Sequence, residues 1–77
     1  NPFNPSTNIN YIVEKSSRLN IDLFNLKGEK IKTLFSGVRN IGKYSLNVNL
    51  DNLPSGQYLI KLANQNNVEI RKVTLLK

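Results

Sequence analysis

A chain of 77 residues has room for one domain, and because it contains neither Cys nor His, it lacks disulfides and the usual zinc ligands. Lys and Arg outnumber Asp and Glu by 11 to 5, but they stand singly along the chain, which favours a solvated basic surface over a nucleic-acid site. No apolar run approaches the roughly 20 residues that a transmembrane helix needs, so no membrane-spanning segment is expected.

The chain opens with NPFNPST, which places prolines at positions 2 and 5. Proline removes a backbone donor and pushes the preceding residue toward extended geometry, which excludes a helix or a central strand here. We interpret residues 1–6 as a leading segment and residues 7–77 as the folded part of a single domain. In this interpretation Phe3 lies at the rim of the core, while Pro2 and Pro5 keep that edge from pairing with other chains.

Alternation of apolar and polar residues predicts two strands early in the chain. The first covers residues 7–13, and the second follows the Ser16-Ser17 pair and ends at the turn Asn25-Leu26-Lys27-Gly28. We expect these strands to form a hairpin-like pair. Their core-facing side chains are predicted to be Ile9, Tyr11, Val13, Leu19, Ile21 and Leu23.

The middle of the chain predicts one mixed strand and one clear strand. Residues 29–35 alternate with Ile31, Thr33 and Phe35 on one side, but both faces carry polar and apolar residues. Residues 36–42 contain two glycines and are predicted to be a loop. From Tyr44 to Leu50 the alternation is complete, which predicts a half-buried strand.

The stretch LPSGQYLIKL, residues 53–62, predicts a corner followed by a fifth strand. Leu53, Pro54 and Gly56 lead to Tyr58, which is the local chemistry of a tyrosine corner, in which a buried phenol donates a hydrogen bond to backbone a few residues upstream. A short polar turn at residues 65–67 then leads to a last strand over residues 68–76. The connection to this last strand is too short for anything but an antiparallel hairpin.

Together these patterns predict an all-β, immunoglobulin-like antiparallel sandwich of six to seven strands, because no 3.6-residue stripe competes with them. A seventh strand, if present, is expected in NPFNPST or in residues 29–42. Tyr11, Tyr44 and Tyr58 are in phase with aliphatic neighbours and are predicted to be core residues rather than a stacking platform for nucleic acid. Phe24 is in phase with Asp22 instead, so it either folds over the rim of the sandwich or forms an exposed contact.

The titratable residues predict no catalytic site. General acid-base or nucleophilic catalysis uses His, Cys or paired carboxylates, and the acidic residues here are isolated. Asp51-Asn52 lacks the second acid that a calcium loop needs, and the glycines stand singly rather than in a phosphate-binding loop. We therefore expect no enzyme, no metal and no cofactor.

Several motifs in this order resemble the type A C-terminal sorting domain of the bacterial type IX secretion system. They are NPFNPST, the turn over residues 25–30, Gly42-Lys43-Tyr44, LPSGQY and the final IRKVTLLK. The resemblance covers the whole chain, although the Tyr-Pro that usually precedes the first Asn-Pro is absent. It implies a seven-stranded immunoglobulin-like fold attached behind a cargo protein.

The resemblance also implies a function. Such domains direct a cargo, already delivered to the periplasm, to an outer-membrane translocon, and a sortase-like peptidase commonly removes them as the cargo reaches the cell surface or the medium. The expected partners are thus the translocon, the sortase-like component and the upstream cargo, with the domain itself a monomer. The family's turn glycines correspond to Gly28 and Gly56. Its signal-like last strand corresponds to Arg71, Lys72, Val73, Leu75, Leu76 and Lys77.

Two other classes of protein fit the same residues. One is an immunoglobulin-like structural or adhesive module, including a glycan-binding one, and the other is the immunoglobulin-like domain of flagellar hook-cap scaffold proteins. Position in the precursor discriminates between them, because a sorting domain is expected at the extreme C-terminus. For the sorting domain, we hypothesise that a receptor reads the last strand by strand addition at its edge.

Overall fold

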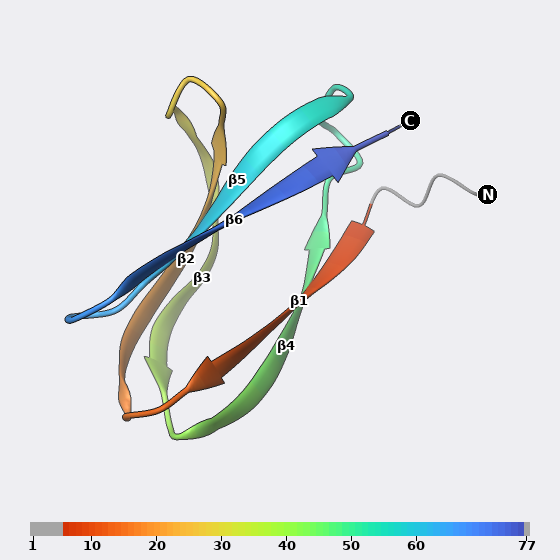
Figure 1. The fold of residues 1–77 in the computed structure, drawn as a ribbon. Coiled ribbons are helices and arrows are strands. Elements are labelled where there is room, and N and C mark those ends of the chain that lie inside the picture. Colours follow the sequence, from red (N-terminus) through yellow and green to blue (C-terminus); the bar gives the residue numbers. More distant parts are fainter. Residues whose placement is uncertain (1–5, 77) are drawn as a thin grey trace.

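The computed structural model describes residues 6–76, which form six β-strands (Figure 1). The described residues contain no helix, and so none that is long and apolar enough to cross a membrane. The predictions for Pro2, Phe3, Pro5 and Lys77 concern residues outside this described part. In chain order the strands are β1 (Ser6–Val13), β2 (Ser17–Asn25), β3 (Lys30–Arg39), β4 (Gly42–Asn49), β5 (Gly56–Ala63) and β6 (Val68–Leu75).

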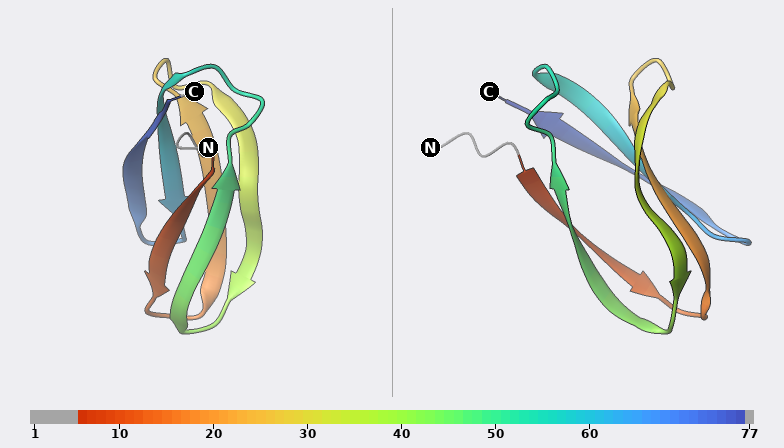
Figure 2. Two further views of the ribbon diagram at one scale, coloured as in Figure 1. Left: turned by 90° about the vertical axis from the view of Figure 1, so that its right-hand side faces the viewer. Right: turned by 180° about the vertical axis from the view of Figure 1, so that it is seen from behind.

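The strands form two antiparallel sheets that face each other (Figure 2). The large sheet has four strands in the order β3-β2-β5-β6, and the small sheet consists of β1 and β4. β5 and β6 pair as the predicted hairpin, with Gly56 opposite Leu75 and Ala63 opposite Val68. The all-β sandwich is therefore confirmed, whereas the immunoglobulin-like detail stays a prediction.

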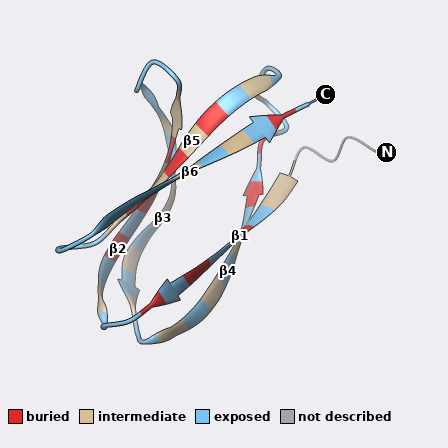
Figure 3. Cartoon of the chain, viewed as in Figure 1, coloured by how far each residue is buried: buried red, intermediate tan, exposed pale blue. Residues whose placement is uncertain are grey.

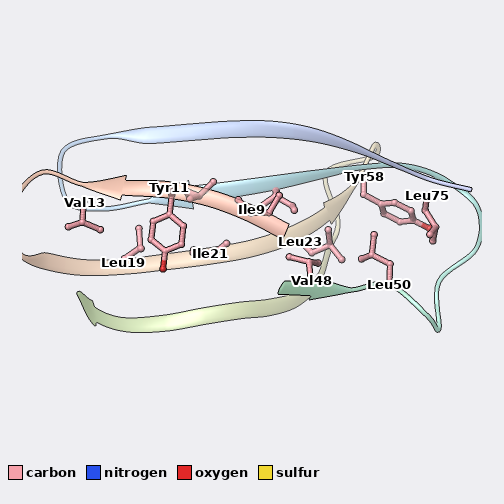
Figure 4. Close-up of a cluster of buried hydrophobic side chains, with 12 residues drawn as sticks. Ile9, Tyr11, Val13, Leu19, Ile21, Leu23, Val48, Leu50, Tyr58 and Leu75 are labelled. Carbon is pink, nitrogen blue, oxygen red and sulfur yellow. The ribbon is translucent and has the colours of Figure 1, made fainter. Parts of the chain in front are cut away.

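The core lies between the two sheets, and it forms because alternate residues of each strand point inward. Ile21 and Leu23 of β2, Ile60 of β5 and Val48 of β4 are almost completely buried. Figure 3 shows the resulting alternation of buried and exposed residues along the strands, and Figure 4 shows the buried side chains gathered in one layer. Tyr11 and Tyr58 belong to this layer as predicted, and Tyr44 packs half-buried against it.

The predicted pairing of the first two strands is wrong. β1 pairs with β4, from Ser6 opposite Asn49 to Val13 opposite Gly42, and β2 lies in the other sheet between β3 and β5. The segment between β1 and β2 thus crosses from one sheet to the other. An alternating pattern indicates which face of a strand is buried. The pattern is the same whether the next strand in the chain lies beside that strand or in the opposite sheet.

The predicted loop over residues 36–42 is also wrong, because β3 continues through Ser36, Gly37 and Val38 to Arg39. Gly37 pairs with Leu19, and a Cβ atom added at Gly37 would lie 3.3 Å from the Phe35 ring. The glycine therefore accommodates a close side chain within the strand rather than a turn. Residues 29–42 accordingly hold β3 and no seventh strand.

Bulges in the pairing of β2 with β3 explain why polar and apolar residues occur on both faces of the predicted third strand. The register shifts between Ile21 and Asp22 and again between Leu23 and Phe24. An extra residue on one strand changes which side chains face inward, and here Leu34 and Phe35, neighbours in sequence, both pack against the core. The predicted face of Ile31, Thr33 and Phe35 is therefore correct only in part.

Both predicted turn motifs have the expected local structure. At the turn between β2 and β3, the Asn25 side-chain oxygen accepts hydrogen bonds from the backbone N–H groups of Lys27 (2.9 Å) and Glu29 (3.0 Å), and Gly28 has φ +86°. At the corner before β5, the Tyr58 hydroxyl donates to the backbone carbonyl of Pro54 at 2.5 Å. The hydrogen bond predicted for the tyrosine corner is thus confirmed.

Cationic side chains close the side of the sandwich where β3 and β4 meet. The Lys32 ammonium donates to the Asn49 carbonyl at 3.1 Å, so an edge residue of the large sheet contacts an edge residue of the small one. The Arg39 guanidinium carbon lies 4.2 Å from the Phe35 ring centre and 4.9 Å from that of Tyr44. These contacts join the edges of two sheets that share no backbone pairing on this side.

Candidate functional site

The last strand, β6, is the candidate site, and a short asparagine turn sets its position. The Asn64 side chain accepts hydrogen bonds from the backbone N–H groups of Asn66 (2.9 Å) and Asn67 (2.7 Å), while the Asn64 N–H donates to the Asn67 carbonyl at 2.9 Å. Asparagine readily mimics a backbone turn in this way. The turn therefore returns the chain alongside β5 and leaves β6 at the edge of the large sheet.

Only one edge of β6 is paired within residues 6–76. That edge meets β5 along the whole strand, from Val68 opposite Ala63 to Leu75 opposite Gly56. On the other side a side-chain hydrogen bond from Arg71 reaches β1 of the small sheet, but no backbone pairing joins the two strands. An edge of this kind presents a row of backbone donors and acceptors to an incoming strand.

The predicted recognition residues divide between the two faces of β6. Leu75 is buried in the core, and Val73 is half-buried against it. Lys72 is exposed on the opposite face, since alternate residues of a strand point to opposite sides, and Leu76, directly after the end of β6, is exposed as well. Lys77 lies outside the described residues. The strand therefore combines a core-forming face with a solvent-facing one, and the predicted set does not form a single patch.

Arg71 connects β6 to β1. Its guanidinium donates a hydrogen bond through Nη1 to the backbone carbonyl of Asn10, and its Nε donates to the Glu69 carboxylate at 2.7 Å. Glu69 and Arg71 are two residues apart on one face of the strand, so the carboxylate holds the guanidinium toward β1. This bridge joins the open edges of the two sheets on the side opposite Lys32 and Arg39.

Two clefts lie along the boundary between β1 and β6. The larger, about 570 Å³, lies between the end of β1 and the turn before β6 and is lined by residues 11–17 and 64–69 together with Leu19 and Leu62. The smaller, about 290 Å³, lies between the start of β1 and the end of β6 and includes Ser6, Thr7 and Leu75. β1 and β6 thus run past each other in opposite directions with hollows between them, and Arg71 crosses between the strands at Asn10.

The side chains of Glu29 and Glu69 serve local structure rather than a shared site. Glu29 accepts a hydrogen bond from the Asn25 side chain at 2.7 Å, and Glu69 pairs with Arg71 at 2.7 Å. Residues 6–76 contain no group of three or more acidic, His or Cys side chains placed to hold a metal ion.

Sequence reasoning found β6 but missed two of its features. The bridge from Arg71 to Asn10 was not predicted, although the alternation places Arg71 on the same face as Val73 and Leu75, where a cation needs a partner. The exposure of Ile70, at 59%, was not anticipated either. The sequence contained a signal for this exposure, because Ile70 and Lys72 are two residues apart and therefore lie on the same, solvent-facing side of the strand.

The comparisons with known proteins identify a family for this chain. A family model described as a secretion system C-terminal sorting domain matches residues 1–76, which is nearly the whole chain. Searches of curated proteins and of solved structures returned no significant match. The match runs through all six strands, the Tyr58 corner and the edge strand β6. The chain therefore belongs to the family of secretion system C-terminal sorting domains.

Proposed function

We propose that this domain directs an attached cargo through the outer membrane by the type IX secretion system, and that the translocon reads the free edge of β6 by strand addition. Membership in the sorting-domain family supports the first part, because such a domain implies a cargo upstream and contact with a secretion system. The observation that carries the second part is the single pairing of β6. One edge of β6 forms backbone hydrogen bonds with β5, and within residues 6–76 the other edge pairs with no strand.

Strand addition fits the way in which buried and exposed side chains alternate in β6. An added strand obtains affinity from main-chain hydrogen bonds, and it obtains specificity from alternate side chains. In β6 the inward side chains of Val73 and Leu75 are already committed to the core, so the outward ones are those available to a receptor. Lys72 and Leu76 are exposed on that outward face.

The first experiment removes residues 70–77 from a cargo-bearing precursor and follows the cargo by cell fractionation and surface labelling. Our proposal predicts that the truncated protein stays in the periplasm. Surface delivery of the truncated protein would contradict the proposal and would favour a structural or adhesive module. Because the truncation also removes Leu75 from the core, a second experiment must separate recognition from folding.

The second experiment uses proline at two consecutive positions, Lys72→Pro and Val73→Pro. Consecutive residues direct their N–H groups to opposite edges, so one variant removes a hydrogen bond to β5 and the other removes a donor of the free edge. Thermal unfolding of each proline variant is compared with that of the alanine variant at the same position, so that lost side-chain packing cancels, and the proline with the smaller additional destabilisation is the free-edge one. We expect this variant to block surface delivery.

Alanine at the same two positions controls for loss of the side chains. Lys72→Ala and Val73→Ala keep every backbone donor, so a delivery defect in either folded variant measures the loss of its side chain alone. Normal delivery of the stable proline variant would exclude reading of the free edge, even if the domain remains necessary for secretion.

A further inference from the structure

The outer face of the large sheet, which points away from the core, carries a row of side chains that crosses all four strands. Lys30 of β3 lies opposite Phe24 of β2, Phe24 lies opposite Leu59 of β5, and Leu59 lies opposite Lys72 of β6. Neighbouring strands are about 4.8 Å apart, so the backbones at the two lysines are roughly 14 Å apart across the sheet, with two apolar residues between them. Phe24 and Leu59 are half-buried, whereas both lysines are exposed.

The adjacent row of the same face also combines a lysine with an exposed apolar side chain. Lys61 lies opposite Ile70, which is 59% exposed, and the Lys61 ammonium lies 5.9 Å from the centre of the Phe24 ring. Asp22 stands opposite Lys61 in this row, and Thr33 of β3 stands opposite Asp22. We call Phe24, Leu59 and Ile70, together with Lys30, Lys61 and Lys72, the basic apolar face.

The outer face of the small sheet differs in kind. Asn8, Asn10, Ser45 and Asn47 occupy it, and the Asn47 amide donates to the Asn8 side chain at 2.9 Å. Ile12 and Lys43 stand opposite each other at its end. The small sheet thus presents a mainly neutral polar surface, while the large sheet presents an apolar centre with cations at both sides.

We propose that the basic apolar face docks an acidic protein surface, with carboxylates pairing with Lys30 and Lys72 and apolar side chains covering Phe24 and Leu59. The charge on this face argues for such a partner, because its three lysines stand against one aspartate. The face is formed by side chains of all four strands and shares Lys72 with the proposed reading of β6. It requires no added strand, so this proposal goes beyond strand addition and does not depend on it.

The shape of the face favours a protein over a membrane or a nucleic acid. Phe24 and Leu59 are half-buried within the sheet surface, so the centre of the face offers a flat contact, and Ile70 at its side is the one apolar residue of the face that is mostly exposed. Nucleic-acid sites place cations along a phosphate track with exposed aromatic rings for stacking, whereas here the cations flank an apolar centre. Protein interfaces commonly combine an apolar centre with a charged rim.

The test measures binding of the 77-residue chain to a fluorescein-labelled ten-residue peptide of alternating Glu and Val, by fluorescence anisotropy. A peptide with Lys in place of Glu serves as the opposite-charge probe, and phosphatidylglycerol vesicles serve as the membrane probe. We expect binding to the Glu peptide that weakens in 0.5 M salt, because the lysine–carboxylate pairs are exposed. The Lys peptide should not bind.

Charge reversal locates the surface. Lys30→Glu with Lys72→Glu should weaken binding of the Glu peptide at least tenfold. The matched control, Lys15→Glu with Lys43→Glu, makes the same change in net charge away from this face and should retain binding within about threefold. Ile70→Ser, which alters an exposed side chain, should weaken binding severalfold and thereby identify the apolar contribution. Circular dichroism and thermal unfolding verify that each variant is folded.

Several outcomes would overturn the proposal. Absence of binding to the Glu peptide is one, and equal loss of binding in the matched control is another, because it would show attraction by net charge alone. Equal binding of the Lys peptide would also overturn it. Binding to phosphatidylglycerol vesicles that needs Lys30 and Lys72, without binding to the peptide, would replace the protein partner with an anionic membrane surface.

Discussion

Arg71 and Asn10, which are 61 residues apart in the chain, join the last strand to the first through a hydrogen bond from the guanidinium to the Asn10 carbonyl. No backbone pairing connects β1 with β6, so this side-chain contact bridges the open edges of the two sheets. A charged side chain at a sheet edge also hinders uncontrolled pairing with other chains. Arg71 therefore stabilises the sandwich at the strand where we place recognition.

Replacing Arg71 with alanine is expected to loosen this boundary. The substitution removes the hydrogen bond to the Asn10 carbonyl and the partly exposed ion pair with Glu69, and together these losses should lower the free energy of unfolding by about 1 kcal/mol. Amide hydrogen exchange should accelerate around Asn10 and Glu69. Lys72→Ala, on the opposite face of the same strand, is the control and should leave both measurements unchanged. Equal effects of the two substitutions would show that the contact with Asn10 does not stabilise β1.

Tyr58→Phe tests the corner before β5. The hydroxyl donates to the Pro54 carbonyl at 2.5 Å from a side chain that is 6% exposed, so its removal should lower the free energy of unfolding by about 1–2 kcal/mol. Tyr44→Phe removes a 2.8 Å hydrogen bond to the Asn40 carbonyl at an exposed site and should cost less. Urea unfolding of both variants measures the order. The reverse order would mean that the corner contributes little to stability.

The sequence patterns predict burial better than they predict neighbours. Alternation located the core-facing side chains of β1 and β2, and the Tyr58 corner identified its own hydrogen bond, because both depend on local geometry. The partner of β1 depends on contacts between distant segments, and the alternation of Ile9, Tyr11 and Val13 is compatible with either sheet. Gly37 was misread for a related reason, since the Phe35 ring that explains it is placed by tertiary packing.

The candidate site was predictable to a similar extent. A last strand that hairpins onto β5 follows from the short turn at residues 64–67, and it was located correctly. That Arg71 reaches β1 required the relative position of the two sheets, which no local pattern contains. The row from Lys30 to Lys72 likewise depends on the register of four strands, including two bulges between β2 and β3.

Gly28 is expected to tolerate asparagine better than alanine. Its φ of +86° lies in the left-handed region, where a Cβ atom costs roughly 1–2 kcal/mol, and asparagine enters this region more readily than most residues. No atom lies within 4 Å of an added Cβ, so backbone conformation rather than crowding sets the cost. Thermal unfolding should therefore rank wild type above Gly28→Asn and Gly28→Ala last. Equal stability of wild type and Gly28→Ala would contradict this ranking.

Leu75 and Leu76 form a matched pair that separates folding from recognition at the end of β6. Leu75 is 2% exposed within the core, so Leu75→Ala should lower the free energy of unfolding by about 2–4 kcal/mol. Leu76 is 63% exposed, and Leu76→Ala should leave stability within about 0.5 kcal/mol of wild type. Both variants are measured by urea unfolding and by surface delivery of an attached cargo.

The two leucine variants distinguish a requirement for the folded domain from direct recognition of an exposed side chain. A secretion defect in Leu75→Ala alone shows that the machinery requires the folded domain, because that substitution acts through the core. A defect in Leu76→Ala at unchanged stability shows that the outward face of β6 is itself read, since nothing else in the domain has been weakened. Normal delivery of both Leu76→Ala and Lys72→Ala would restrict recognition to the backbone edge of β6, which the proline variants at Lys72 and Val73 test directly.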